Sequence, residues 1–201
     1  MERKFANLFS YVAHPLLMPV LGLLIISNSG IYAADMDHRF TQFIYLSVFI
    51  FTLLLPAGMI PLFLYSGLAK SIHFSEKRER LVPLYITLVF YLAAYFLIKK
   101  LPVSSVYQKF LFASCMSILF LLAISYFYKI SAHMVGWGGI VGLVLTLSLR
   151  FDADLMLYLV IAILLSGLAG FARLRMDAHT PLQVYLGFSV GFLTMVTVFL
   201  I

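Results

Sequence analysis

The residues best placed to do chemistry lie in the stretch 172–187, ARLRMDAHTPLQVYLG, between two apolar runs. It holds Arg173 and His179 in a chain that otherwise has few charged residues. The pair Thr180-Pro181 is typical of the N-cap and first residue of a helix. His179 would then stand just outside that helix, where its side chain can point into a pocket. An imidazole and a guanidinium beside a helix start favour an anion as the ligand.

A second polar cluster, KISAHMVG at 129–136, has the same character. Ser131 is well placed as the N-cap of the apolar segment that follows, which would leave free backbone N–H groups beside His133. We therefore expect Ser131 and His133 to contribute to the same anion site as His179.

A third polar cluster, SIHFSEKRERLVP at 71–83, carries several cations. His73, Lys77 and Arg80 are spaced i, i+4 and i+7, which places them on one stripe if the stretch is helical. Lys77 and Arg80 are therefore candidates to bind an anion. The alternative is that they anchor the loop at lipid headgroups.

The elements that must position these clusters are membrane spans. The chain is 63% hydrophobic and 11% charged, whereas a soluble domain has about 25% charged residues. Crossing a bilayer takes about 20 apolar residues per helix. Segments near that length run over about 11–34, 40–69, 81–98, 108–128, 133–149, 154–171 and 181–201. The sequence predicts an all-α, polytopic transmembrane helical bundle of six to seven membrane-spanning helices.

This bundle is expected to form a single integral membrane domain over 1–201. Its partner is the lipid bilayer, and no basic, solvated domain of the kind that binds nucleic acid is present. The first apolar run is interpreted as a span that is retained rather than as a cleaved signal peptide, because prolines interrupt it. Pro56 and Pro61 predict a kink or an extension in the second span.

An even number of spans separates each polar cluster from the next, so all three should meet the same membrane surface. Pairs of small residues four apart, Gly138/Gly142 and Gly187/Gly191, let helix backbones approach closely. The helices that follow the second and third clusters should therefore pack tightly and hold His133 and His179 within reach of one phosphate. The basic residues do not decide which surface is cytoplasmic, since several are candidate ligand-binding groups.

The stretch 172–187 resembles the third motif of the type 2 phosphatidic acid phosphatase family. That motif is Ser-Arg, five residues, His, three residues, Asp, and Gly four residues further on. This chain has Ala172-Arg173, five residues, His179, three residues, Gln183, and then Gly187. The arginine, the histidine and the glycine match, and Gln183 replaces the aspartate.

The other two motifs of the family are similar in part. The second is Pro-Ser-Gly-His, against ISAH at 130–133. The first is Lys, six residues, Arg-Pro, against His73 seven residues before Arg80, with the proline two places late at Pro83. The resemblance covers roughly residues 70–195, which would be the phosphatase-like core.

The resemblance implies a phosphatase that acts on lipids at the membrane surface, with a lipid phosphate or pyrophosphate as substrate. His179 would be the nucleophile that forms a phosphohistidine, and His133 the general acid for the leaving alkoxide. The phosphoryl oxygens would be held by Arg173, Arg80, Lys77 and Ser131. Such a transfer needs positioning and charge neutralisation. We expect no metal and no other cofactor, and the sequence lacks the clusters typical of a metal site.

Gln183 has two interpretations. It can stand in for the aspartate that orients the nucleophilic histidine, although an amide carries no charge. Alternatively, Thr180-x-x-Gln183 is a capping box, which would occupy the Gln183 side chain and keep it from His179. Asp177 is then a possible substitute carboxylate, although a spacing of two residues from His179 is awkward.

Gln183 therefore leaves activity open, and two alternative functions stand beside the enzyme. The first is a catalytically weak or inactive protein on the same fold that binds or transports a lipid phosphate. The second is a structural bundle whose cations touch headgroups. In each case we expect an integral protein of a bacterial inner (plasma) membrane.

Overall fold

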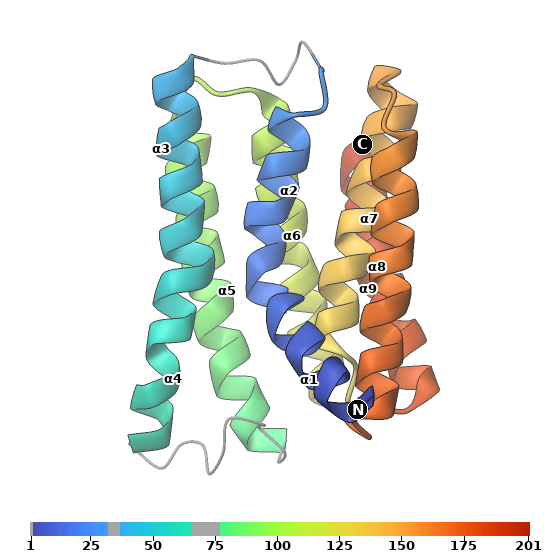
Figure 1. Cartoon of the computed structure of the whole chain (residues 1–201). Coiled ribbons are helices and arrows are strands. Elements are labelled where there is room, and N and C mark those ends of the chain that lie inside the picture. The colour runs from blue at the N-terminus through green and yellow to red at the C-terminus, as the bar shows by residue number, and fades with distance from the viewer. Residues whose placement is uncertain (1, 32–36, 66–76) are drawn as a thin grey trace.

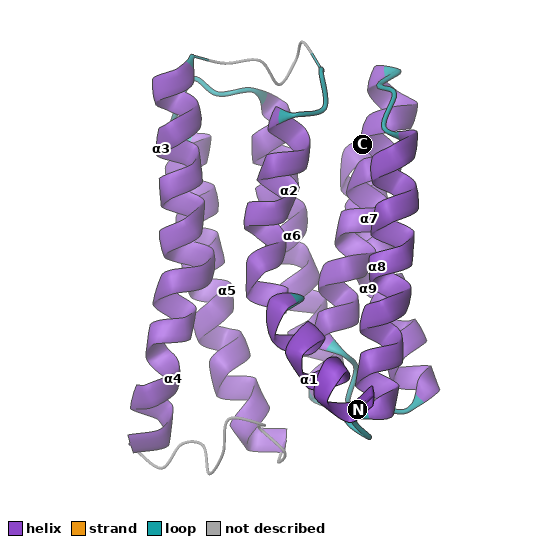
Figure 2. Cartoon of the chain, viewed as in Figure 1, coloured by secondary structure: helices purple, strands orange, loops and turns teal. Residues whose placement is uncertain are grey.

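The protein is helical throughout the part that the structure describes. The computed structural model describes residues 2–31, 37–65 and 77–201, without the side chains of 5, 64 and 77–79. Every regular element in these ranges is a helix (Figure 2). Seven helical segments in them are long and apolar enough to cross a membrane. The prediction of an all-α polytopic bundle is confirmed, at the upper end of the expected number of spans.

The first span is a broken helix, and it begins earlier than the predicted start near residue 11. It consists of α1 (Glu2–Val12), the short 3-10 turn η1 (Pro15–Leu17) and α2 (Met18–Ser27). The break lies at His14, whose backbone is extended and whose Nδ1 accepts a hydrogen bond from the backbone N–H of Leu16 at 3.3 Å. Proline at position 15 favours this break, because it disfavours a helical residue before it.

The second span also departs from a regular α-helix. It runs through α3 (His38–Val48), the π-helical segment η3 (Phe49–Leu54) and α4 (Leu55–Tyr65). The wide π turns lie just before Pro56, which has no N–H to donate to the preceding turn. The predicted irregularity at the prolines is thus accommodated by a local change of helix type, and Pro61 lies inside α4.

The other five spans are continuous helices. They are α5 (Lys77–Lys99), α6 (Ser105–Ser125), α7 (Ala132–Phe151), α8 (Met156–Arg175) and α9 (Pro181–Leu200). Figure 1 shows α7, α8 and α9 grouped together, with α2 and α6 between this group and the group of α3, α4 and α5. The N-terminus, the α6–α7 connection and the α8–α9 connection all lie at the lower end of the bundle, and α1 crosses this end obliquely.

Helices α7 and α9 are in close contact along glycine positions. A Cβ atom added at Gly187 would lie 2.6 Å from the carbonyl oxygen of Ser131, and one added at Gly142 would lie 2.9 Å from that of Phe192. Only a residue without a side chain permits such an approach. The tight packing of these two helices is confirmed, and it places the segments before them, which carry the second and third polar clusters, side by side.

Candidate functional site

A cavity of about 930 Å³ opens among the helices, and polar residues from distant parts of the chain line it. Its titratable lining includes three imidazoles, four strong cations and one carboxylate, which are His14, His133, His179, Arg3, Arg80, Lys129, Arg173 and Asp177. The candidate residues His179, His133, Arg173 and Arg80 are therefore brought together. The side chain of Lys77 and all of His73 lie outside the described residues, so their predicted roles are left as predictions.

The turn between α8 and α9 sets the position of His179. Helix α8 ends where the backbone N–H of Ala178 donates to the carbonyl of Arg173 at 3.1 Å and that of Asp177 donates to the carbonyl of Leu174 at 3.0 Å. Asp177 takes the left-handed conformation, with φ of 54°, which completes a Schellman-type helix end. Asp177 thus serves the turn, and no hydrogen bond joins its side chain to His179 among the described residues.

Gln183 both caps α9 and contacts His179. Its Oε1 accepts the backbone N–H of Thr180 at 3.2 Å, while the Thr180 hydroxyl accepts the backbone N–H of Gln183 at 3.5 Å, which is the predicted capping box. The same Oε1 lies 3.1 Å from Nδ1 of His179. The expectation that a capping Gln183 would be unavailable to His179 is wrong, because one oxygen has lone pairs for both donors.

This contact determines which nitrogen of His179 carries the proton. The Gln183 atom is an oxygen, since it accepts from a backbone N–H, and it cannot donate to the ring. The proton of neutral His179 is therefore on Nδ1, and Nε2 keeps its lone pair. A histidine of this tautomer, oriented by an acceptor at Nδ1, is a suitable nucleophile.

The surroundings keep His179 neutral. The pKa of His179 is lowered to about 4, chiefly by burial and in addition by the nearby positive charges of Lys129, Arg173 and Arg80, and the hydrogen bond to Gln183 opposes this shift. At neutral pH the ring is therefore unprotonated at Nε2 and available for attack.

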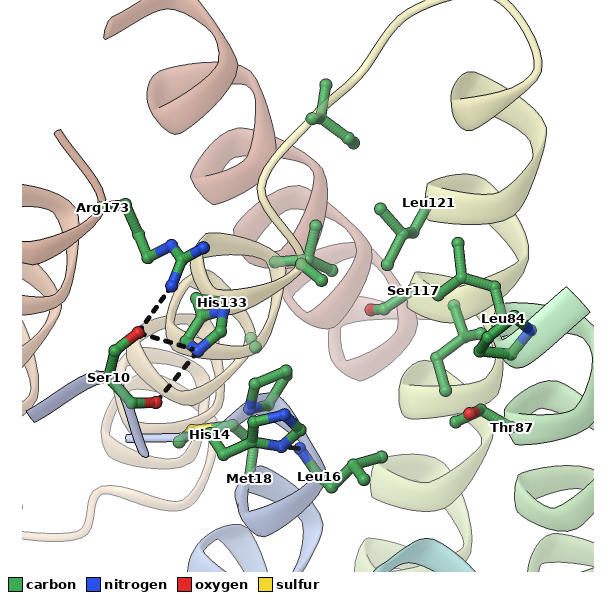
Figure 3. Close-up of a pocket in the computed structure, with 18 of the residues that line it drawn as sticks. Ser10, His14, Leu16, Met18, Leu84, Thr87, Ser117, Leu121, His133 and Arg173 are labelled. Carbon is green, nitrogen blue, oxygen red and sulfur yellow. Dashed lines mark hydrogen bonds between the residues drawn. The ribbon is translucent and has the colours of Figure 1, made fainter. Parts of the chain in front are cut away.

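His133, in the first turn of α7, is held by Ser10 of α1. Its Nε2 lies 3.1 Å from the backbone carbonyl oxygen of Ser10 and 3.3 Å from the Ser10 hydroxyl oxygen (Figure 3). The ring of His14 packs edge-on against that of His133, with centroids 5.5 Å apart. A carbonyl only accepts, so Nε2 of His133 carries a proton and the neutral ring has its lone pair on Nδ1.

Among the described residues, no ion pair joins Arg80, Lys129 or Arg173 to a carboxylate, although Asp177 also lines the cavity. Arg80 and Arg173 each have a buried Nε without a hydrogen-bond acceptor among the described residues. Lys129 lies in the same positive field, and its pKa is lowered by burial and by the charges of Arg80 and Arg173. Burying like charges together is unfavourable unless an anion compensates them. The site is thus electrostatically suited to a multiply charged anion.

Ser131 occupies the predicted N-cap position of α7 but does not act as predicted there. Its hydroxyl makes no capping hydrogen bond and is buried without a partner in the described structure. Its backbone N–H donates to the carbonyl oxygen of Gln183 at 3.2 Å, so this group is not free for a ligand. Ser131 is not among the described residues lining the cavity. Its contribution is to join the starts of α7 and α9.

Sequence reasoning missed the contribution of the first span and of Lys129. Ser10 and His14 lie in a run that the hydrophobic pattern assigns to the bilayer, and His14 alone suggests a packed interfacial residue. Both residues line the cavity. Two features of the sequence could have indicated this role. Ser10 and His14 are four residues apart, which places them on the same face of a helix, and Pro15 interrupts the span beside them.

The inner part of the cavity is mostly apolar and extends along the membrane-spanning segments. Met18 and Leu84 lie there with Leu121 (Figure 3), and Pro56 and Ile60 of α4 also contribute. In this part of the cavity hydrocarbon side chains predominate, and the hydroxyl groups of Thr87 and Ser117 lie among them (Figure 3). This distribution matches an amphiphile with a charged head.

Comparison with protein-family models, with curated proteins and with solved structures finds no match in any of the three. The likeness to the type 2 phosphatidic acid phosphatases thus stays a prediction from short motifs.

Proposed function

We propose that this protein is a membrane lipid phosphatase that hydrolyses a lipid phosphate or pyrophosphate through a phosphohistidine intermediate. The observation that carries the proposal is the joint lining of one cavity by His179, His133 and two arginines whose buried Nε atoms have no hydrogen-bond partner in the described part of the chain. The setting we propose is a bacterial inner (plasma) membrane, in line with the seven apolar helices.

The proposed reaction uses the side chains in two steps. The Nε2 lone pair of His179 attacks phosphorus, and the bond from phosphorus to the lipid oxygen breaks. His133 enters this step as the imidazolium beside the phosphate anion, and it gives the proton of Nδ1 to the leaving alkoxide, because its Nε2–H is held by the Ser10 carbonyl. Water then attacks the phosphohistidine, His133 takes the proton of that water, and the bond from phosphorus to Nε2 breaks to release inorganic phosphate. His179 returns to its starting form, so each step balances without a further reactant.

The cations and the helix start would stabilise the charge that spreads over the transferred phosphoryl group. Arg173 and Arg80 offer fixed guanidinium donors, and Lys129 adds a third positive charge. The first N–H groups of α7 have no acceptor within their own helix, and Ala132 and His133 of this turn line the cavity, so these groups are candidates to bind a phosphoryl oxygen. The apolar inner lining supports a lipid substrate over a water-soluble phosphate.

One observation favours a second candidate, a protein that binds or transports a lipid phosphate without hydrolysis. The partner of His179 is an amide and carries no charge. In the Ser-His-Asp triad, the comparable carboxylate-to-amide change lowers kcat by about 10⁴. A slow or absent chemical step with intact binding would follow if His179 needs a carboxylate to stabilise its cationic intermediate.

The test is phosphate release and lipid binding measured together. The purified protein in detergent is supplied with phosphatidic acid and with a long-chain diphosphate, for wild type and His179→Ala. His38→Ala is the matched control, because His38 is exposed and contacts Gln42. A phosphatase releases phosphate in wild type and His38→Ala and none in His179→Ala. Saturable binding without release would support the second candidate, and neither activity would overturn both.

A further inference from the structure

Ser10 lies near the end of α1 and connects the two sides of the polar cluster. It is buried, with 7% of its surface exposed. Its hydroxyl oxygen accepts a hydrogen bond from Nη1 of Arg173 at 2.6 Å and lies 3.3 Å from Nε2 of His133. Figure 3 shows Arg173 and His133 both directed at Ser10, which also lines the cavity.

The direction of these hydrogen bonds can be assigned by counting protons. The Ser10 carbonyl lies 3.1 Å from Nε2 of His133 and can only accept, so that nitrogen bears a hydrogen. The Ser10 hydroxyl oxygen then also accepts from Nε2, and a second N–H reaches it from Arg173. Both of its lone pairs are engaged, and its own hydrogen has no acceptor among the described residues.

We propose that Ser10 donates this hydrogen to a phosphoryl oxygen of the bound ligand, so that the N-terminal helix supplies a direct anion-binding group. A hydroxyl that accepts two N–H bonds, one of them from a guanidinium, is polarised toward donation. An oxyanion in the cavity provides the acceptor that the hydrogen lacks. The identity of the anion as a lipid phosphate rests on the proposed function, whereas the role of Ser10 as a donor to an anion does not.

Contacts near the start of α1 and beyond its end hold this helix in the position that Ser10 needs to donate to an anion. Near its start, Glu2 forms an exposed ion pair with Arg175 of α8, with Nε of the arginine donating at 2.8 Å. Beyond its end, His14 packs against His133. The position of Ser10 is thus fixed relative to α7 and α8, which carry His133 and Arg173.

The test uses binding of dodecylphosphonate, whose phosphorus–carbon bond resists hydrolysis, and of uncharged dodecanol, by calorimetric titration in detergent. Ser10→Ala should weaken dodecylphosphonate binding about tenfold, the effect of losing a hydrogen bond to a charged group. Dodecanol binding should not change. Ser10→Cys has a side chain of similar size and a weaker donor, so its affinity for dodecylphosphonate should lie between those of wild type and Ser10→Ala. Ser166→Ala is the matched control, because this buried hydroxyl bonds the Ile163 carbonyl within its own helix.

A double-mutant cycle with Arg173→Ala separates direct donation from an effect through Arg173. Direct donation predicts that Ser10→Ala still weakens dodecylphosphonate binding at least threefold when Arg173 is absent. Loss of the effect in that background, or unchanged binding by Ser10→Ala alone, would overturn the proposal.

Phosphate release from phosphatidic acid, measured in the same preparations, distinguishes the two proposals. Wild type that binds dodecylphosphonate and releases no phosphate would refute hydrolysis, while the Ser10 comparison still decides donation. Wild type that releases phosphate, with Ser10→Ala equal to it in both assays, would refute donation alone. Absence of dodecylphosphonate binding by wild type would refute the role of Ser10.

Discussion

The side-chain oxygen of Gln183 lies 3.1 Å from Nδ1 of His179 and 3.2 Å from the backbone nitrogen of Thr180. The side-chain oxygen of Gln183 thus accepts a hydrogen bond from a backbone N–H at the start of α9, and it also fixes the tautomer of the His179 ring. The stability of α9 at its start and the orientation of His179 are therefore coupled through a single residue.

Replacing Gln183 by aspartate should preserve or raise turnover. A carboxylate can accept from Nδ1 and also stabilises the positive charge that develops on His179 during attack. The measurement is kcat for phosphate release from phosphatidic acid. A collapse of activity in a folded Gln183→Asp protein would show that the amide is needed as a cap and not as an orienting group.

Removing the Gln183 side chain should affect catalysis more than removing the cap alone. Gln183→Ala loses the contact with His179 and the cap, whereas Thr180→Ala loses only the hydroxyl half of the capping box. Both variants should lose about 1 kcal/mol of unfolding free energy. Only Gln183→Ala should also lower kcat, by about tenfold or more, and equal kcat values in the two would contradict the orienting role.

The pH dependence of activity should reflect the lowered pKa of His179. Because the pKa is about 4, Nε2 stays unprotonated above that pH, and the acidic limb of kcat/KM that His179 causes should lie near pH 4. Lys129→Met removes a positive charge that disfavours protonation, so it should move this acidic limb to higher pH. An unchanged limb in Lys129→Met would argue against the electrostatic coupling.

The same shift links stability to pH. The folded-state pKa of about 4 lies below the ordinary value of 6.5, so the unfolded chain binds the proton more tightly. The free energy of unfolding should therefore decrease as pH falls from about 6.5 to about 4. His179→Ala should show a shallower decrease over this range, as measured by unfolding in detergent.

Arg173 and Arg175 provide a matched pair on one helix. Arg173→Lys should raise KM for the lipid phosphate about tenfold, because lysine cannot reproduce the planar donor fork that reaches Ser10 and the ligand. Arg175→Lys should leave KM unchanged, since its ion pair with Glu2 is on the surface. Equal effects of both would indicate a general role of positive charge at the headgroups.

Helix packing gives a prediction on stability. A Cβ atom at Gly191 would clash with the carbonyl group of Val135, lying 2.8 Å from its carbon, whereas one at Gly167 meets nothing within 4 Å. Gly191→Ala should therefore destabilise the protein by about 3 kcal/mol, and Gly167→Ala should not. Thermal unfolding in detergent checks both, and a stable Gly191→Ala would contradict the close α7–α9 contact.

Much of the fold followed from apolar run length, and the close contact of α7 with α9 followed from Gly187 and its neighbouring small residues. The length of an apolar run and the spacing of small residues are both local in sequence, because each can be read from a single helix. The placement of His133 and His179 at the same end of the bundle followed from counting spans. Here the sequence was sufficient.

The contacts within the site were not predictable in the same way. Ser10 reaches His133 and Arg173 because the first span breaks at His14 and α1 crosses the end of the bundle (Figure 1), which is a property of tertiary packing. The pattern of residue types presents capping and orienting by Gln183 as alternatives, since it does not show that two donors approach one oxygen. Whether two donors share one acceptor depends on three-dimensional geometry, which cannot be predicted from the spacing of residues in the sequence.

The glycine seam between α7 and α9 has a further consequence for how such a chain can evolve. The segments that begin these helices carry both imidazoles, so any mutation that wedges the seam apart also separates the reactive pair. Selection for correct assembly in the bilayer thereby preserves the spacing of the histidines as well. Under the proposed function, drift in substrate preference is then left to the apolar side chains of the cavity lining, which can change size without separating the two helices.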